Sequence, residues 1–246
     1  VGLRGNISRL ESKLSNQILE FPFSEINLNT SSVSGNIGFR YNYNKSSFKV
    51  QYSNGFRSPN LDDLGKIFDS EPGNIIIPNA DLEPEYVNNY ELNYEFKSDK
   101  IILKNTFFYI RLNNAIIRTD SKFNGKDSII YDGVLSKVQQ LNNGAKAYVY
   151  GFSNLLNFKL NESVNIEHTI SFNNFKDKIN NRPLRHSSPL FGRLSLNYSK
   201  RKIKLGYNIS YNGKKKLINF SPSELNKLYL YTQYGSPAWI THNLFF

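Results

Sequence analysis

Two acidic residues in a polar turn are the first candidates for chemistry in this sequence. Asp62 and Asp63 follow Pro59 in the segment GFRSPNLDDLGK, where an extended stretch ends and one helical turn could begin. Adjacent carboxylates could bind a cation, but acids in the first turn of a helix also stabilise its positive end. Because Asn60 stands where it could cap that turn, we interpret the two acids as capping residues and predict no metal site.

The residue types of enzyme active sites are scarce here or poorly placed. The chain has no cysteine, which excludes a thiol nucleophile, and its three histidines, at positions 168, 186 and 242, lack metal-ligand spacing. A hydrolase would need a histidine beside a nucleophile or an acid, and His168 lies on the apolar side of its predicted strand. We therefore expect no catalytic residue, no cofactor and no enzymatic activity.

Composition limits the remaining classes of protein. The 246 residues carry a formal net charge of +11, and 39% of them are hydrophobic. No stretch approaches the ~20 consecutive apolar residues of a transmembrane helix, so any membrane crossing must use strands. The charge could suit nucleic acid, anionic lipid or an anionic ligand. Because the basic residues are spread over predicted turns and loops, we expect no nucleic-acid partner.

Polar and apolar residues alternate along most of the chain, which predicts β-strands. In VSGNIGFRYNY, apolar side chains occupy most odd positions from 33 to 43, and polar ones occupy every even position except 38, which is glycine. The same alternation recurs throughout the chain. It predicts about ten strands, at 1–12, 33–43, 47–57, 86–96, 101–112, 144–159, 163–174, 190–199, 203–212 and 237–246.

The connections between these strands alternate strictly between short and long. The short ones are NKS, KSDK, LNES and KRK, and the long ones run 13–32, 58–85, 113–143, 175–189 and 213–236. An outer-membrane barrel has this pattern, with tight periplasmic turns, long external loops and no strand edge left open in lipid. The sequence therefore predicts an all-β fold, an antiparallel transmembrane β-barrel.

Aromatic residues near the short turns would form the periplasmic girdle of such a barrel. They are Tyr41, Tyr43, Phe48, Tyr94, Phe96, Phe158 and Tyr198. The alternative interpretation is the aromatic core of a soluble β-sandwich, which the alternation of loop lengths disfavours.

Charged and amide side chains occupy the opposite face of the strands, where we expect the lumen of the barrel. The lumen-facing candidates are Arg40, Lys49, Gln51, Glu91 and Glu95. Lys49 and Glu95 lie near the same rim, so their side chains could pair across strands. A solvated ladder of charges and a contact with a ligand or plug remain alternative roles for this face.

Two short motifs frame the 58–85 connection. The first comprises Phe56, Arg57, Ser58 and Pro59, and the second comprises Asn79, Leu82, Pro84 and Glu85. Pro59 cannot donate to a strand ladder, so pairing should end there. Together with a later strand that carries Ala147 and Gly151, the two motifs resemble the barrel of TonB-dependent outer-membrane receptors, and the resemblance covers nearly the whole chain.

This resemblance implies that residues 1–246 form one segment of a 22-stranded barrel in the cell outer membrane, without the globular plug and its TonB box. It implies a receptor for energised uptake of a scarce ligand, with the TonB complex acting through the missing plug. We expect a ferric siderophore or another iron chelate. The alternatives are cobalamin, haem, glycan or peptide import, and a passive porin or adhesin barrel. No histidine lies between residues 57 and 81, which disfavours haem.

Two of the long connections supply candidates for contact with a ligand. In the 213–236 connection, Lys214, Lys215 and Lys216 could attract an anionic chelate or bind the phosphates of lipopolysaccharide. Tyr229 and Tyr231 in the same connection could stack on a ligand or pack within the loop. The 58–85 connection has glycines at positions 65 and 73, so we expect it to move as a lid over the ligand.

Overall fold

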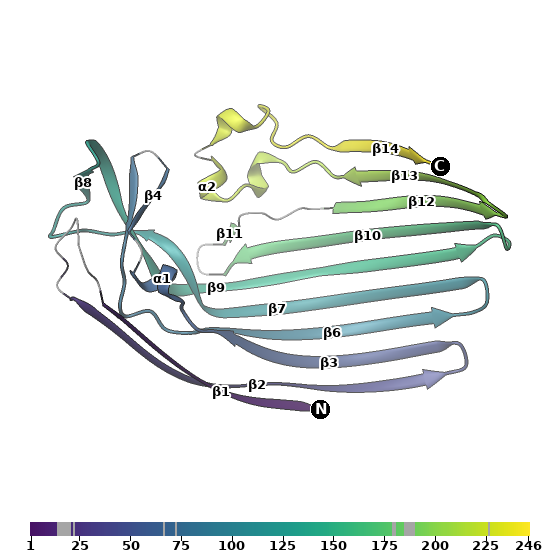
Figure 1. Ribbon diagram of the computed structural model, residues 1–246, viewed down its shortest axis with the longest axis horizontal. Helices are drawn as coiled ribbons and strands as arrows, with labels where there is room; N and C mark the ends of the chain where they lie inside the picture. The colour runs from purple at the N-terminus through teal and green to yellow at the C-terminus, as the bar shows by residue number, and fades with distance from the viewer. Residues whose placement is uncertain are drawn as a thin grey trace. The chain divides into compact units, whose positions relative to one another are not determined.

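The computed structural model describes residues 1–13, 21, 23–65, 67–71, 73–178, 181–184, 190–225 and 227–246. Ten strands follow one another in a single antiparallel path (Figure 1). They are β1 (Gly2–Lys13), β2 (Glu25–Tyr43), β3 (Ser46–Arg57), β6 (Glu85–Lys97), β7 (Ile101–Asp120), β9 (Val134–Lys159), β10 (Val164–Asp177), β12 (Leu190–Lys200), β13 (Ile203–Asn212) and β14 (Trp239–Phe245). The prediction of an all-β antiparallel architecture with about ten strands is confirmed.

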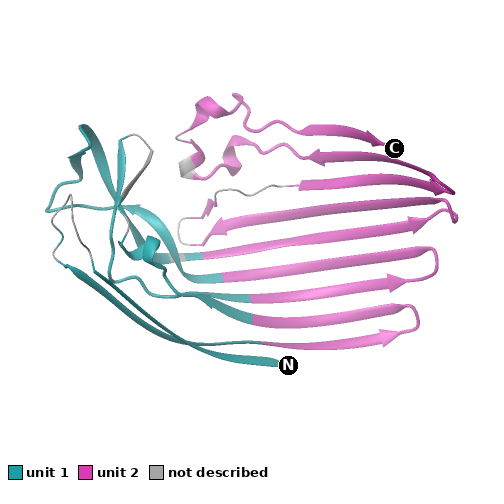
Figure 2. Cartoon of the chain, viewed as in Figure 1, with its two compact units in different colours: residues 1–35, 54–88, 112–146 teal, residues 36–53, 89–111, 147–246 magenta. Residues whose placement is uncertain are grey.

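The chain divides into two compact units, which Figure 2 shows in different colours. Unit 1 comprises residues 1–35, 54–88 and 112–146, and unit 2 comprises residues 36–53, 89–111 and 147–246.

Unit 2 contains the four tight turns, which lie at the same end of its strands (Figure 1). Two of these turns have only two residues between the strands, at 44–45 and 201–202. Asn44 and Arg201 have φ angles of 50° and 55°, the left-handed conformation that two-residue hairpins require. The antiparallel register of β12 with β13 runs without a shift from Phe191 opposite Asn212 to Lys200 opposite Ile203.

The strands of unit 2 keep one apolar face and one polar face. Large side chains on the apolar face are exposed, among them Phe39 at 71% and Tyr41 at 55% relative exposure. Tyr90 and Leu92 of β6 lie on this face, at 45% and 47% exposure. A water-soluble protein rarely exposes such a continuous apolar surface, so this face is suited to another apolar medium.

Unit 1 contains short strands that the sequence did not predict. They are β4 (Phe68–Glu71), β5 (Asn74–Ile77) and β8 (Ser128–Tyr131). β5 pairs with β4 in antiparallel orientation. It also pairs with β9 in parallel orientation, with Asn74 opposite Lys137 and Ile77 opposite Gln140. β8 pairs with β9 in antiparallel orientation. We call β4, β5, β8 and residues 134–140 of β9 the loop sheet.

Two small clusters of buried side chains form the core of unit 1. Ile75, Ile77 and Val138 make the first within the loop sheet, with exposures of 0%, 5% and 0%. The second joins Ile26 of β2 to Leu64 and Leu82. Leu64 belongs to α1 (Leu61–Gly65), so this cluster fastens the short helix to the strands.

Three strands are longer than predicted. β2 begins at Glu25, β7 continues to Asp120, and β9 begins at Val134, so parts of the predicted 13–32 and 113–143 loops are strand. In β2 the alternation continues before the predicted start, since Ile26 and Leu28 still alternate with polar neighbours.

The remaining elements are short. They are β11 (Arg182–Pro183), η1 (Leu217–Asn219), α2 (Pro222–Leu225) and η2 (Leu228–Leu230). In the described part of the chain, no helix is both long enough and apolar enough to span a membrane.

Candidate functional site

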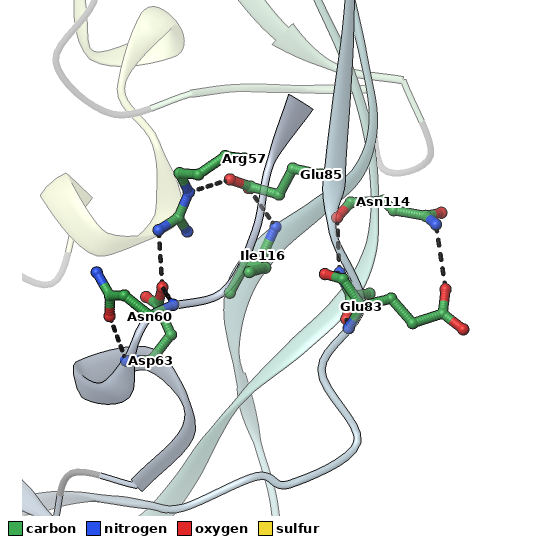
Figure 3. A network of polar contacts seen from close by, with 8 residues as sticks. Arg57, Asn60, Asp63, Glu83, Glu85, Asn114 and Ile116 are labelled. Atoms are coloured by element: carbon green, nitrogen blue, oxygen red, sulfur yellow. Dashed lines mark hydrogen bonds and ion pairs between the residues drawn. The ribbon is translucent and has the colours of Figure 1, made fainter. Parts of the chain in front are cut away.

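Arg57, the last residue of β3, is the centre of a polar network in unit 1 (Figure 3). Its Nη1 lies 2.7 Å from Oδ2 of Asp63, and its Nε donates to Oε2 of Glu85. The second carboxylate oxygen of Glu85 accepts the backbone N–H of Ile116 at 2.6 Å. The two motifs predicted from the sequence therefore meet through one ion-paired arginine.

Asn60 and Asp63 form a reciprocal cap at the start of α1. The Asp63 N–H donates to Oδ1 of Asn60 at 2.9 Å, and the Asn60 N–H donates to Oδ2 of Asp63 at 3.0 Å. This confirms the predicted capping role of Asn60 and Asp63. Leu64 is fully buried, whereas Leu61 is 51% exposed. Pro59, just before the cap, is buried.

The second motif is bound to β9 by amide side chains. Asn79 is 8% exposed, and its Nδ2 donates to the carbonyl of Leu141 at 2.8 Å. The Glu83 N–H donates to Oδ1 of Asn143 at 2.7 Å, and Nδ2 of Asn143 returns a bond to the Glu83 carbonyl. The sequence analysis did not identify Asn143, because nothing in the local sequence indicates that this strand asparagine binds the backbone of Glu83.

Three further members of the motifs have simpler surroundings. Leu82 is 2% exposed and packs in the cluster with Leu64, whereas Phe56 and Pro84 are half-buried. The motifs therefore combine one apolar anchor with polar bonds, and together they position the ends of β3 and β6.

The middle of the 58–85 connection is a strand of the loop sheet, and its movement as a lid stays a prediction. β5 is held between β4 and β9, and its Ile75 and Ile76 are 0% and 1% exposed. Gly73 has a φ angle of 83° and makes the turn between β4 and β5, so its conformational freedom serves a fixed bend. Residues 66 and 72 of this connection lie outside the described residues.

All five predicted lumen-facing residues lie on the polar face of unit 2. Arg40, Lys49, Glu91 and Glu95 line one pocket, to which Gln51 does not contribute. Glu95 pairs with Lys104 of the adjacent strand, at 3.6 Å from Nζ to Oε1.

The predicted pairing of Lys49 with Glu95 is wrong, since no ion pair joins these two described residues. Glu91 accepts a hydrogen bond at 2.9 Å from the side-chain amide of Asn89. The pocket thus presents side chains of both charges, which could contact a polar ligand or another polar protein surface.

The 213–236 connection in unit 2 buries one of its three predicted lysines. Lys215 is 8% exposed, and its Nζ lies 2.9 Å and 3.0 Å from the two carboxylate oxygens of Glu224. Burial alone would raise the pKa of Glu224, but the backbone N–H of Ser221 and the Lys215 ammonium hold that pKa below its ordinary value. Lys215 is therefore a structural residue.

The other candidates in this connection have different surroundings. Lys214 and Lys216 are exposed, and Nζ of Lys214 lies 5.3 Å from the ring centroid of Tyr234. Tyr229 is 81% exposed, whereas Tyr231 packs edge-on against Phe220 with ring centroids 4.6 Å apart. Lys214, Lys216 and Tyr229 remain available to a ligand or to lipid headgroups.

His168 lies on the apolar face of unit 2, as predicted. Its Nε2 lies 2.8 Å from the hydroxyl of Tyr211. His242 makes a similar contact, since its Nδ1 lies 2.6 Å from the hydroxyl of Tyr207. His186 lies outside the described residues. Among those that are described, no group of three or more His, Cys, Asp or Glu residues could hold a metal ion.

Comparison with known proteins identifies this architecture. A family model described as TonB dependent receptor-like, beta-barrel, matches residues 2–246. The copper transporter OprC has 13% identity and a TM-score of 0.69, over 96% of this chain and 34% of that chain. The siderophore receptor PirA from Acinetobacter baumannii has 16% identity and a TM-score of 0.67, over 89% of this chain and 35% of that chain.

A third similar structure is a variant of the ferric enterobactin receptor PfeA from Pseudomonas aeruginosa in complex with enterobactin. It has 16% identity and a TM-score of 0.68, over 89% of this chain and 34% of that chain. At these identities the likeness shows the fold alone. No curated protein matches this chain significantly.

Proposed function

This chain belongs to the TonB-dependent receptor-like β-barrel family of the outer membrane, and we propose that it is part of a receptor for the energised uptake of a scarce ligand. The observation that carries the proposal is the family match over residues 2–246. The family consists of transporters, so the chain is not assigned an enzymatic activity. The chain spans about a third of the solved structures that it resembles, for instance 34% of OprC.

We infer that the apolar face of unit 2 contacts lipid and that its polar face, with Arg40, Lys49, Glu91 and Glu95, faces the lumen. The exposure of aromatic side chains on the first face supports this orientation, and so does the mixed charge of the second. The tight turns would then lie at the periplasmic rim, and the 213–236 connection would lie at the cell surface. A plug that is not part of this chain would transmit energy from the TonB complex.

We propose a ferric siderophore or another iron chelate as the imported ligand. Two of the similar structures are named as a siderophore receptor and a ferric enterobactin receptor, which makes this class the first to test. OprC is named as a copper transporter, but this chain has no Cys and no Met to supply soft copper ligands. The exposed Lys214 and Lys216 would favour an anionic chelate over a bare cation.

Deletion of the gene tests the proposal. We expect the deletion strain to lose growth on at least one iron chelate supplied as sole iron source, and a plasmid copy of the gene should restore growth. A strain that lacks TonB should show the same loss, whereas uptake through a passive porin would continue without TonB. Normal growth of the deletion strain on every iron chelate tested would reject iron import. Assays of cobalamin, haem, glycan and peptide uptake would then distinguish the alternatives.

A further inference from the structure

The apolar face of unit 2 contains an asymmetry of charge. All acidic residues within the described strands of this unit, Glu91, Glu95, Glu167 and Asp177, alternate onto the polar face. Away from the tight turns, the apolar face carries two charged residues, Arg111 of β7 and Lys176 of β10. Both are cations, and within the part of the chain that the structure describes neither forms an ion pair.

A row of aromatic rings locates these two cations. On the apolar face, ring centroids are 6.4 Å apart from Tyr90 to Tyr109, 6.2 Å from Tyr109 to Tyr148, and 6.2 Å from Tyr148 to Tyr150. The row continues to Phe172, 6.5 Å from Tyr150. It therefore crosses four neighbouring strands, β6, β7, β9 and β10.

Both cations lie at the edge of this row that is farther from the tight turns. Arg111 follows Tyr109 by two residues on the same face of β7, and Lys176 is the direct cross-strand partner of Tyr148. Both strands run away from the tight turns at this point, and two residues of strand advance by about 6.8 Å. The ladder fixes both backbone positions, so the two cations belong to the sheet and not to a loop.

Rows of tyrosine mark the level where a barrel passes from hydrocarbon to headgroups. A cation at the outer edge of such a row lies at the depth of the headgroups, where about 1 kcal/mol per cation is gained from anionic lipid. An exposed arginine can bind a phosphate group with two parallel hydrogen bonds, and a lysine can contribute a second point charge. No acid competes for them on this face.

We propose that Arg111 and Lys176 form a binding site for the phosphate groups of a phosphorylated glycolipid in the outer leaflet, the lipid A part of lipopolysaccharide. The inference rests on the orientation proposed above, with the tight turns at the periplasmic rim. It concerns the lipid contact of the barrel and not the imported ligand, so the two proposals can fail separately.

Binding of lipid A to the full-length receptor in detergent tests the site. Bisphosphorylated and dephosphorylated lipid A are titrated against the wild type and against the double variant Arg111→Gln/Lys176→Gln, with native mass spectrometry as the readout. We expect the double variant to bind bisphosphorylated lipid A about 25-fold more weakly, about five-fold per cation. Its affinity for dephosphorylated lipid A should stay within two-fold of the wild type, and inorganic phosphate should not displace the lipid.

The matched control is Arg193→Gln/Lys204→Gln, which removes two cations from the polar face of β12 and β13. It should bind lipid A as the wild type does. Equal affinity of wild type and the Arg111/Lys176 variant, an equal loss in the control, or displacement by inorganic phosphate would overturn the proposal. If the double variant fails to fold, as judged by heat-dependent gel mobility, the single variants Arg111→Lys and Arg111→Gln are titrated with bisphosphorylated lipid A instead. Only the second should then lose affinity.

Discussion

Lys215 and Glu224 form a buried ion pair inside the 213–236 connection, with Nζ 2.9 Å from Oε1 and both side chains 10% exposed. The ammonium also lies 5.3 Å from the ring centroid of Phe220, which is itself 3% exposed. The backbone N–H of Ser221 donates to the other carboxylate oxygen at 2.8 Å. This connection therefore has an interior of its own, although it lacks regular strands.

Removal of one partner of this pair should loosen the connection. Lys215→Ala leaves the Glu224 carboxylate buried without its cation, and we expect the opening free energy of residues 213–236 to fall by about 3–5 kcal/mol. Hydrogen exchange measures the opening directly. Lys216→Ala, which removes an exposed neighbour, is the control and should change the exchange little. Equal protection in the two variants would mean that the ion pair does not hold the connection together.

Acid should open the same connection. Because its neighbours hold the pKa of Glu224 below the ordinary value of about 4.3, the folded connection favours the carboxylate more than the unfolded chain does. This stabilisation is complete above that ordinary pKa and is lost as the pH falls from about 5 through the lower pKa of the folded state. Proteolysis by pepsin at a series of pH values should show the change, and Glu224→Gln should flatten it. An unchanged pH profile in Glu224→Gln would assign the acid sensitivity to other groups.

The sequence predicts the strands of unit 2 well, because one face of each strand is apolar and the other is polar, so the two kinds of residue alternate clearly along the chain. β12 and β13, predicted at 190–199 and 203–212, span Leu190–Lys200 and Ile203–Asn212. That contrast fades in unit 1, where residues 25–32 and 134–143 carry polar side chains on both faces. The parallel pairing of β5 with β9 joins residues about sixty positions apart, and no local pattern specifies such a partner.

The candidate site shows the same division between local and distant contacts. The cap of Asp63 by Asn60 spans three residues, so helix-capping rules could predict it. The burial of Lys215 depends on Glu224, and the sequence GKKK alone presents three equivalent cations. The burial of Ile75 likewise depends on β9, a partner that the local sequence of the 58–85 connection does not indicate.

The loop sheet should respond as one body to a cavity in its core. Ile75→Ala removes a side chain with 0% exposure, and we expect a loss of about 2–5 kcal/mol in the free energy of unfolding of this sheet. Protease sensitivity should then rise in both the 58–85 and the 113–143 connections. Ile130→Ala is the matched control, because Ile130 of β8 is 74% exposed. If only the 58–85 connection became sensitive, the two connections would move independently.

Cysteine labelling in intact cells should place the tight turns and the 213–236 connection on opposite sides of the membrane. The chain has no cysteine, so a single introduced thiol gives an unambiguous signal. Lys214→Cys should react with an impermeant maleimide added outside, whereas Ser98→Cys, in a tight turn, should react only after the outer membrane is permeabilised. Reaction of both positions from outside would contradict the proposed barrel orientation.

The alternation within β6 should determine how the protein tolerates charge in a lipid bilayer. Leu92 lies near the middle of β6 on the apolar face, and Glu91 lies on the polar face in the pocket with Arg40 and Lys49. Arginine at position 92 would place a charge in hydrocarbon, so Leu92→Arg should cost about 2–4 kcal/mol near the bilayer midplane. Glu91→Gln keeps the shape of a side chain in a polar environment and should cost much less.

Reversible folding of the receptor into lipid vesicles, followed by tryptophan fluorescence during denaturant titration, would compare the two variants. The comparison is internal, because the two positions are adjacent on one strand and share its depth in the bilayer. Only the face differs, so a large difference in the free energy of unfolding must come from the medium that each side chain meets. Equal costs for the two substitutions would show that β6 does not separate lipid from the lumen.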